Sequence, residues 1–265
     1  MSKTKALFFD IDGTLLTAYP HRVPESAIKA LKAAQAKGHK LFINSGRTLA
    51  LIPPIMKEIG FDGYVCGCGS QIYINDKLIY SSSIPHELCT KVVQKMKECH
   101  LPAVLECSDR LLFDGSGDVL WEFVERLRTM TTVDDISAFS KEESENYTFS
   151  KFYAHKKPDS DVKKFRKFSD LYFTCFEHGS TELEFTMKDC DKASGIRKVL
   201  DYLGLSIEDS YAFGDSSNDL AMLKYAGTSI AMGNSSPAIV PYCTYQTTDI
   251  EDDGIFNALK HFDLI

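Results

Sequence analysis

Acidic residues gather in two short, glycine-containing segments, one near each end of the 265-residue chain. The first is Asp10-Ile11-Asp12-Gly13-Thr14, and the second is Gly214-Asp215-Ser216-Ser217-Asn218-Asp219. At typical residue frequencies, a string of the first kind arises by chance in roughly one of several hundred chains of this length. A purely structural interpretation makes the first segment a solvated turn and the second a helix N-cap, for which Asp and Asn are well suited. Capping accounts for one acid but not for the cluster.

Carboxylates from both segments would lie close together if the segments follow neighbouring strands of one sheet. Like charges at such short range repel strongly unless a cation lies between them. Magnesium prefers oxygen ligands and keeps several waters, which leaves positions open for phosphate oxygens. The sequence therefore predicts a Mg²⁺ site that binds a small-molecule phosphate ester, with four candidate metal residues: Asp10, Asp12, Asp215 and Asp219.

Two further side chains could bind a phosphate next to these acids. Ser45 offers a hydroxyl and backbone N–H groups, and Lys192 can neutralise charge on Asp10 and on a phosphoryl group. A single Ser or Lys is commonplace on protein surfaces, so each counts only through its place in the order of the segments.

Short apolar strands, each followed by a loop and a helix, must position these residues. The two acidic segments and the loop with Ser45 follow predicted buried strands at Ala6–Phe9, Tyr211–Phe213 and Leu41–Ile43, whereas Lys192 lies at the start of a predicted helix. A helix is predicted between Pro24 and Gly38, and another through Ile196 to Leu203. This alternation predicts an α/β fold with a doubly wound parallel sheet, whose ligands bind at the carboxyl ends of the strands.

The pattern changes in the middle of the chain. A hairpin is expected around Asn75-Asp76, and strands then alternate with helices. We expect a discontinuous catalytic core of residues 1–82 and 184–265, with an inserted α+β cap at residues 83–183. Helices in this insertion are expected near 87–98, 118–128 and 159–168. Its basic stretch, Lys151 to Lys157 with Lys163, Lys164, Arg166 and Lys167, is typical of a solvated face and less often of an anion-attracting surface.

Composition narrows the possible partners and location. The formal net charge of -7 argues against nucleic acid or an anionic membrane as a partner, because such partners require a surplus of Lys and Arg. No apolar run approaches the roughly 20 residues that span a bilayer. Eight cysteines without a C-x-x-C pair indicate reduced thiols, and we expect a cytoplasmic protein.

Four segments, in this order, resemble the four motifs of the haloacid dehalogenase superfamily of phosphohydrolases. They are Asp10-Ile11-Asp12-Gly13-Thr14, Asn44-Ser45-Gly46-Arg47, Asp191-Lys192 and Gly214-Asp215-Ser216-Ser217-Asn218-Asp219. The insertion between the second and third segments resembles the cap of the Cof-type sugar-phosphatase branch. The resemblance covers the whole chain and includes the turn Ala231-Met232-Gly233-Asn234 after the fourth segment.

The resemblance implies a role for each matching residue. Asp10 would be the nucleophile, Asp12 the general acid and base, and Ser45 and Lys192 phosphate binders. Asp215 would bind magnesium together with Asp10 and the backbone carbonyl of Asp12, and Asp219 would support the metal. The remaining motif residues are assigned to substrate binding: Gly13, Gly46, Arg47 and Asn218.

The implied reaction is hydrolysis of small phosphate monoesters, most of all sugar phosphates, through an aspartyl phosphate on Asp10. Branches of the superfamily that act as dehalogenases or ATPases lack an acid at the position of Asp12. A phosphotransferase or mutase with the same site, and a catalytically weak sugar-phosphate sensor, stay open as alternatives. A phosphoacceptor receiver domain is disfavoured because such domains are about half this length and carry no cap.

One segment departs from the family pattern. Relatives in this branch carry an Asn-Gly-Ala turn after the third strand, where this chain has Cys66-Gly67-Cys68-Gly69-Ser70. A metal pair made by Cys66 and Cys68 is disfavoured, because no further Cys or His ligand lies nearby in the sequence. We expect the substitution to alter which substrate fits.

Overall fold

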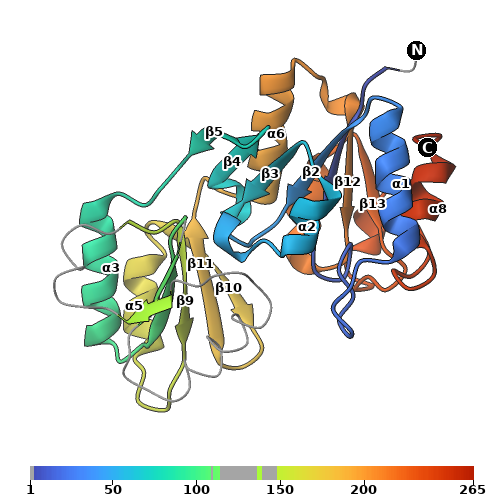
Figure 1. Ribbon diagram of the computed structural model, residues 1–265. Helices are drawn as coiled ribbons and strands as arrows, with labels where there is room; N and C mark the ends of the chain where they lie inside the picture. The colour runs from blue at the N-terminus through green and yellow to red at the C-terminus, as the bar shows by residue number, and fades with distance from the viewer. Residues whose placement is uncertain (1–2, 109, 114–135, 139–147) are drawn as a thin grey trace. The chain divides into compact units, whose positions relative to one another are not determined.

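Two units, each built around its own sheet, make up the structure of the chain (Figure 1). The structure is a computed structural model that describes residues 3–108, 110–113, 136–138 and 148–265. The first unit comprises Met1–Gly46, Ile55–Tyr80 and Asp191–Ile265, and the second comprises Arg47–Pro54 and Ser81–Cys190. Three stretches expected in the core therefore group with the inserted segment: residues 47–54, 81–82 and 184–190.

The first unit contains an eight-stranded sheet in the order β14-β13-β12-β1-β2-β3-β4-β5. Neighbouring strands from β14 to β3 are parallel, and β4 runs antiparallel to β3. This arrangement confirms the predicted α/β fold with a parallel sheet. The strands are β1 (Ala6–Phe9), β2 (Lys40–Asn44), β3 (Gly63–Cys66), β4 (Gln71–Ile74), β5 (Lys77–Ser81), β12 (Ser210–Gly214), β13 (Thr228–Ala231) and β14 (Tyr245–Gln246).

Helices cover both faces of this sheet. On one face α1 (Glu25–Ala36) packs against α8 (Gly254–His261), and Figure 1 shows the two side by side. On the other face α6 (Lys192–Leu203) packs against α7 (Leu220–Tyr225). Burial on both faces explains why β1 is the uninterrupted apolar run Ala-Leu-Phe-Phe, with every side chain buried. Phe8, Phe42 and Val65 form one core with Ile196 and Val199 of α6.

The second unit has a six-stranded sheet in the order β10-β11-β9-β6-β7-β8. Helices α3 (His86–Glu98) and α5 (Val162–Ser169) pack on one face, where their apolar side chains meet Phe152 and Phe185. The strands are β6 (Ala103–Glu106), β7 (Leu111–Phe113), β8 (Ile136–Ala138), β9 (Lys151–His155), β10 (Phe173–His178) and β11 (Glu182–Met187). The helix expected near 118–128 lies outside the described residues.

Short helical elements complete the described chain. They are α2 (Pro54–Ile59), η1 (Leu49–Leu51), η2 (Gly67–Gly69), η4 (Ile207–Asp209), η5 (Ser217–Asp219) and η6 (Val240–Tyr242). The expected hairpin turns at Asn75 and Asp76, which both have positive φ.

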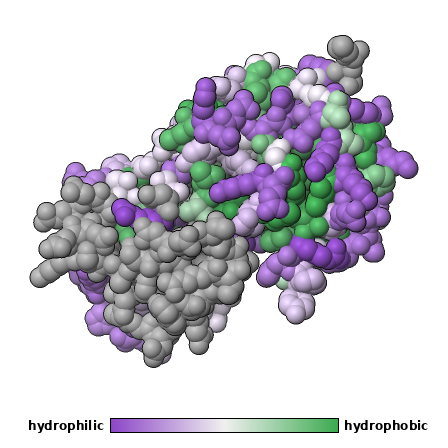
Figure 2. Space-filling model, viewed as in Figure 1, coloured by the Kyte–Doolittle hydropathy of each residue, from purple (hydrophilic) through white to green (hydrophobic). Residues whose placement is uncertain are grey.

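None of the helices that the structure describes is long and apolar enough to cross a membrane. On the face of the first unit that Figure 2 shows, hydrophilic residues surround smaller hydrophobic areas.

Candidate active site

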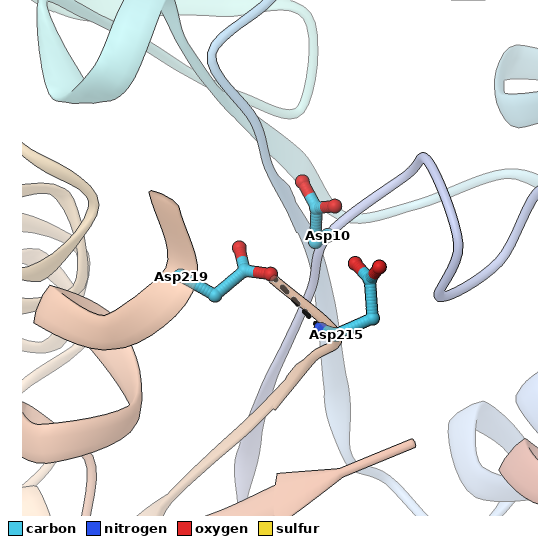
Figure 3. A group of neighbouring side chains, drawn as sticks. All are labelled: Asp10, Asp215 and Asp219. Carbon is cyan, nitrogen blue, oxygen red and sulfur yellow. Dashed lines mark hydrogen bonds between the residues drawn. The ribbon is translucent and has the colours of Figure 1, made fainter. Parts of the chain in front are cut away.

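The central strands of the first unit bring the two acidic segments together. β1 and β12 are parallel neighbours in register, with Phe9 opposite Phe213, and the Asp10 N–H donates to the Phe213 carbonyl over 3.0 Å. Asp10 and Asp215 therefore leave the sheet at adjacent strand ends. Their carboxylates and that of Asp219 each offer an oxygen, and these three atoms lie within 4.8 Å of one another (Figure 3).

Lys192 lies at the first position of α6 and reaches into this group of acids. Asp191 caps the helix by accepting a hydrogen bond from the Ser194 N–H at 2.6 Å. The buried Lys192 Nζ donates to Asp10 Oδ1 and to Asp219 Oδ1, both at 2.6 Å. A single ammonium group thus links the acid that follows β1 to an acid of the β12 segment.

Asp219 holds the loop that carries Asp215. Its Oδ2 accepts hydrogen bonds from the backbone N–H groups of Asp215 at 3.0 Å and Ser216 at 3.1 Å. Figure 3 shows the first of these bonds. Because its other oxygen already accepts from Lys192, Asp219 is engaged on both oxygens. This pattern fits a residue that supports a metal ligand rather than one that supplies a vacant oxygen.

Burial and mutual repulsion perturb the ionisation of these groups. Desolvation, followed by the charge of Asp219, raises the pKa of Asp10 to about 8, although Lys192 opposes the shift. The same two causes raise the pKa of Asp215 to about 7. Burial would lower the pKa of Lys192, but the adjacent carboxylates of Asp10 and Asp219 outweigh it and raise that pKa above its ordinary value. Lys192 therefore stays charged. Its single positive charge faces three carboxylates, those of Asp10, Asp215 and Asp219.

The residues present fit a divalent cation that prefers oxygen ligands. Asp215 Oδ1 is buried and has no hydrogen-bond partner among the described residues. Three clustered carboxylates exceed the single charge of Lys192, and a hard cation would remove both the repulsion and the unmet hydrogen-bonding capacity. Among the described parts of the chain, this is the only group of three or more potential metal ligands.

The other predicted site residues lie at different places. Ser45 is buried at the end of β2, where its N–H donates to the Val65 carbonyl at 2.9 Å, and Gly46 follows it half-buried. Asn218 is exposed, and its Oδ1 accepts from Ser216 Oγ at 2.8 Å.

Two predicted site residues fall outside the carboxylate group. The side chain of Asp12 is exposed and does not belong to the group of three acids. Arg47 belongs to the second unit, where its guanidinium donates to the Leu51 carbonyl at 3.1 Å. The roles expected for these residues stay predictions.

Two asparagines that received no role from the sequence support the site. Asn44 is fully buried, and its Nδ2 donates to the backbone carbonyl of Lys192 at 2.9 Å, which ties the end of β2 to the start of α6. Asn234 Nδ2 donates to the Gly13 carbonyl at 2.8 Å, while its Oδ1 accepts from the Ile250 N–H. Both lie in segments that match family motifs, which was the available signal for them.

The segment that departs from the family pattern forms a tight turn next to Ser45. Gly67–Gly69 is a short 3-10 turn in which Cys68 has a φ of 54°, and the Cys68 N–H donates to the Ser45 carbonyl at 3.1 Å. Cys66 is buried, which raises the pKa of its thiol. A buried thiol with a raised pKa is a poor metal ligand, because the thiolate is the form that binds metals.

Comparison with known proteins supports a phosphatase. The sequence pattern of the haloacid dehalogenase-like hydrolases matches residues 7–259. The chain is 30% identical to YkrA of Bacillus subtilis (strain 168), a protein provisionally named as a phosphatase, over 99% of each chain. It is 25% identical to the pyridoxal phosphate phosphatase YbhA of Escherichia coli (strain K12), over 95% of this chain and 96% of that protein.

A solved structure extends the similarity to the whole fold. The sugar phosphatase BT4131, of subclass IIB of the same superfamily, superimposes with a TM-score of 0.83 and 30% sequence identity, covering 99% of this chain and 100% of that chain. The ordered motifs, the paired acids at neighbouring strand ends and these similarities agree. The chain belongs to the haloacid dehalogenase-like hydrolases, and it is a phosphoric monoester hydrolase.

Proposed function

We propose that this protein is a magnesium-dependent phosphatase that hydrolyses sugar phosphates through an aspartyl phosphate on Asp10. The observation that carries the proposal is the contact of Lys192 with Asp10, beside Asp215, whose Oδ1 accepts no hydrogen bond from the described part of the chain. Asp10 and Asp215, with the backbone carbonyl of Asp12, would hold the magnesium ion. When bound, the ion supplies positive charge that stabilises the phosphoryl group in the transition state.

In the first step a carboxylate oxygen of Asp10 attacks phosphorus as the bond to the ester oxygen breaks. Lys192 stays protonated and neutralises charge on Asp10 and the phosphoryl group. Asp12 gives its proton to the departing alkoxide, which leaves as an alcohol. In the second step the ionised Asp12 takes a proton from water, which attacks the aspartyl phosphate and releases inorganic phosphate. The exposed position of Asp12 outside the carboxylate group is compatible with a proton carrier.

The relatives support a small ester as the substrate. BT4131 is named as a sugar phosphatase and YbhA as a pyridoxal phosphate phosphatase, so two proteins that match this chain over nearly their whole length carry names with different small phosphates. We assign the second unit to the role of a cap that selects among such esters. None of the eight cysteines, all of which lie among the described residues, forms a disulfide, which supports a reducing, cytoplasmic location.

Replacement of the nucleophile tests this mechanism. Asp10→Asn should abolish phosphate release from glucose 6-phosphate while the protein still binds that ester in the presence of magnesium. Intact-mass measurement after rapid quenching should detect a phosphorylated form of the unaltered protein and none of Asp10→Asn. Asp201→Asn, an exposed change on α6, is the matched control and should keep full activity. Full activity of Asp10→Asn would reject the mechanism.

A further inference from the structure

Asn44 joins the strand that precedes Ser45 to the helix that carries Lys192. It is the last residue of β2, and its side chain is fully buried. Its Nδ2 donates to the Lys192 carbonyl at 2.9 Å and to Met222 Sδ, the weaker acceptor, at 3.5 Å. Both partners only accept hydrogen bonds, so the NH₂ end of the amide must face them. One side chain of the first unit therefore contacts α6 and α7 together.

The helix α6 does not need this bond to complete its own hydrogen bonds. A carbonyl group in a helix accepts from the N–H four residues later, and its oxygen keeps a second lone pair. The backbone groups that lack partners at the start of a helix are N–H groups, and Asp191 caps α6 there. The bond from Asn44 is thus additional to the helix, and its effect is to fix the position of the Lys192 peptide group.

Stability does not account for an amide at this position either. Asn44 Oδ1 is buried and has no hydrogen-bond partner among the described residues, which lowers the free energy of unfolding. Leucine has the same branched shape, with methyl groups in place of the oxygen and the nitrogen, and it would avoid that loss. Placement of α6 therefore explains the amide better than stability of the core does.

Close packing prevents α6 from moving toward the sheet but not along it. A Cβ atom added to Gly69 would lie 2.5 Å from the Asp191 carbonyl oxygen, and one added to Gly195 would overlap the side chain of Val65. The first turn of α6 therefore lies directly against β3 and the turn that follows it. Apolar packing is not directional, so it leaves movement along the helix axis open. A hydrogen bond to the backbone of the first turn opposes that movement.

We propose that Asn44 is a positioning residue that sets where Lys192 meets Asp10. Lys192 Nζ lies 2.6 Å from both Asp10 Oδ1 and Asp219 Oδ1, so a small shift of the helix would break one contact or both. Because Asn44 directly precedes Ser45, the same amide also keeps the two predicted phosphate binders, Ser45 and Lys192, at a constant separation. As a statement about phosphoryl transfer, this inference rests on the proposed function.

Rapid-quench kinetics of Asn44→Leu test this role. The first step, formation of the phosphoenzyme from p-nitrophenyl phosphate with magnesium, should slow about 100-fold, the cost of a displacement of about 1 Å. KM should rise much less, because charge attraction declines slowly with distance whereas a hydrogen bond weakens steeply. The Tm should stay the same or rise, since the variant also removes the buried oxygen that has no partner in the described part of the chain.

Met222→Leu is the matched control, because it changes the other contact of the same amide. Met222 is buried, and the exchange of Met for Leu conserves volume, so the first step should keep its rate. Asn44→Ala repeats the test by leaving space instead of filling it, and it should slow the first step as Asn44→Leu does while lowering the Tm. An unchanged rate in both Asn44 variants, or an equal loss in Met222→Leu, would overturn the proposal.

The position of the Lys192 side chain separates this inference from the proposed function. A crystal structure of Asn44→Leu should show Lys192 Nζ out of hydrogen-bonding distance of Asp10 Oδ1, Asp219 Oδ1 or both, whereas the unaltered protein keeps both contacts. If the unaltered protein does not hydrolyse p-nitrophenyl phosphate with magnesium, the phosphatase mechanism fails, and this comparison alone decides for or against positioning by Asn44. Both contacts kept at 2.6 Å in Asn44→Leu would reject it.

Discussion

Gly13 and Asp215 lie so close that a side chain on the first would displace the second. A Cβ atom added to Gly13 would lie 2.5 Å from Asp215 Oδ2 and 2.7 Å from its Cγ. Gly13 also has a φ of +80°, which other residues rarely adopt. The loop after β1 therefore forms the surface against which the carboxylate after β12 rests.

Gly13→Ala should impair catalysis more than folding. The new methyl group would push the Asp215 carboxylate aside, and a displacement of about 1 Å can cost about 100-fold in rate. We expect kcat/KM to fall by about that factor, with weaker magnesium binding by titration calorimetry. Gly38→Ala is the matched control, because Gly38 has a φ of +90° but nothing within 4 Å of the added atom. If Gly13→Ala and Gly38→Ala lowered kcat/KM equally, backbone strain would explain the loss, and displacement of Asp215 would not.

Asp12→Asn should slow turnover to a degree that depends on the leaving group. An alkoxide needs a proton as it departs, whereas p-nitrophenolate is stable without one. The loss in kcat should therefore be larger for glucose 6-phosphate than for p-nitrophenyl phosphate when formation of the phosphoenzyme limits the rate. Stopped-flow measurement of that first step compares the two esters directly. Identical losses would remove Asp12 from the role of general acid.

Magnesium should stabilise the protein more at higher pH. Burial raises the pKa values of Asp10 and Asp215 from 3.8 to about 8 and about 7, so the folded metal-free protein holds protons that the unfolded chain releases. The free energy of unfolding without metal therefore falls as pH rises from about 4 to about 8. The gain in Tm from magnesium over EDTA should be greater at pH 8 than at pH 6. A gain independent of pH would contradict these shifts.

Asp209→Asn should destabilise the first unit at neutral pH. Asp209 is buried and lies 2.5 Å from Lys3 Nζ and 2.8 Å from Lys5 Nζ, and these bonds hold the pKa of its carboxyl well below the ordinary value. We expect a loss of about 1–3 kcal/mol in urea unfolding. Because the folded pKa is lowered, this contribution is complete above about pH 4 and disappears only below it. Asp263→Asn, in an exposed pair with Lys37 at 3.4 Å, should change little.

The positions of the principal acids could be predicted because local pattern and strand order determine them. A short apolar run ending in Asp10 and another ending before Asp215 predicted parallel strand ends, and register pairing of β1 with β12 makes them neighbours. The contacts of Asn44 could not be predicted in this way, since its partner lies 148 positions away in sequence. Nor did the two-residue strand β14 offer a pattern long enough to recognise.

Lys151 shows the same limit for charged residues. In the sequence it stands in a run of basic residues, which is typical of an exposed face. The burial of Lys151 depends on the pairing of β9 with β6 and β11, because those two strands supply its partners Glu106 and Glu184. Local charge patterning cannot reveal a partner 33 positions along the chain.

The central place of β1 has a consequence for synthesis on the ribosome. β1 has one neighbour, β2, that follows it soon after, whereas its other neighbour, β12, begins only at Ser210. The nascent chain thus carries an apolar strand with one open hydrogen-bonding edge while the entire second unit is made. Asp10 leaves the tunnel well before Lys192, Asp215 and Asp219, so it gains its ammonium partner and fellow carboxylates only after those later residues have emerged.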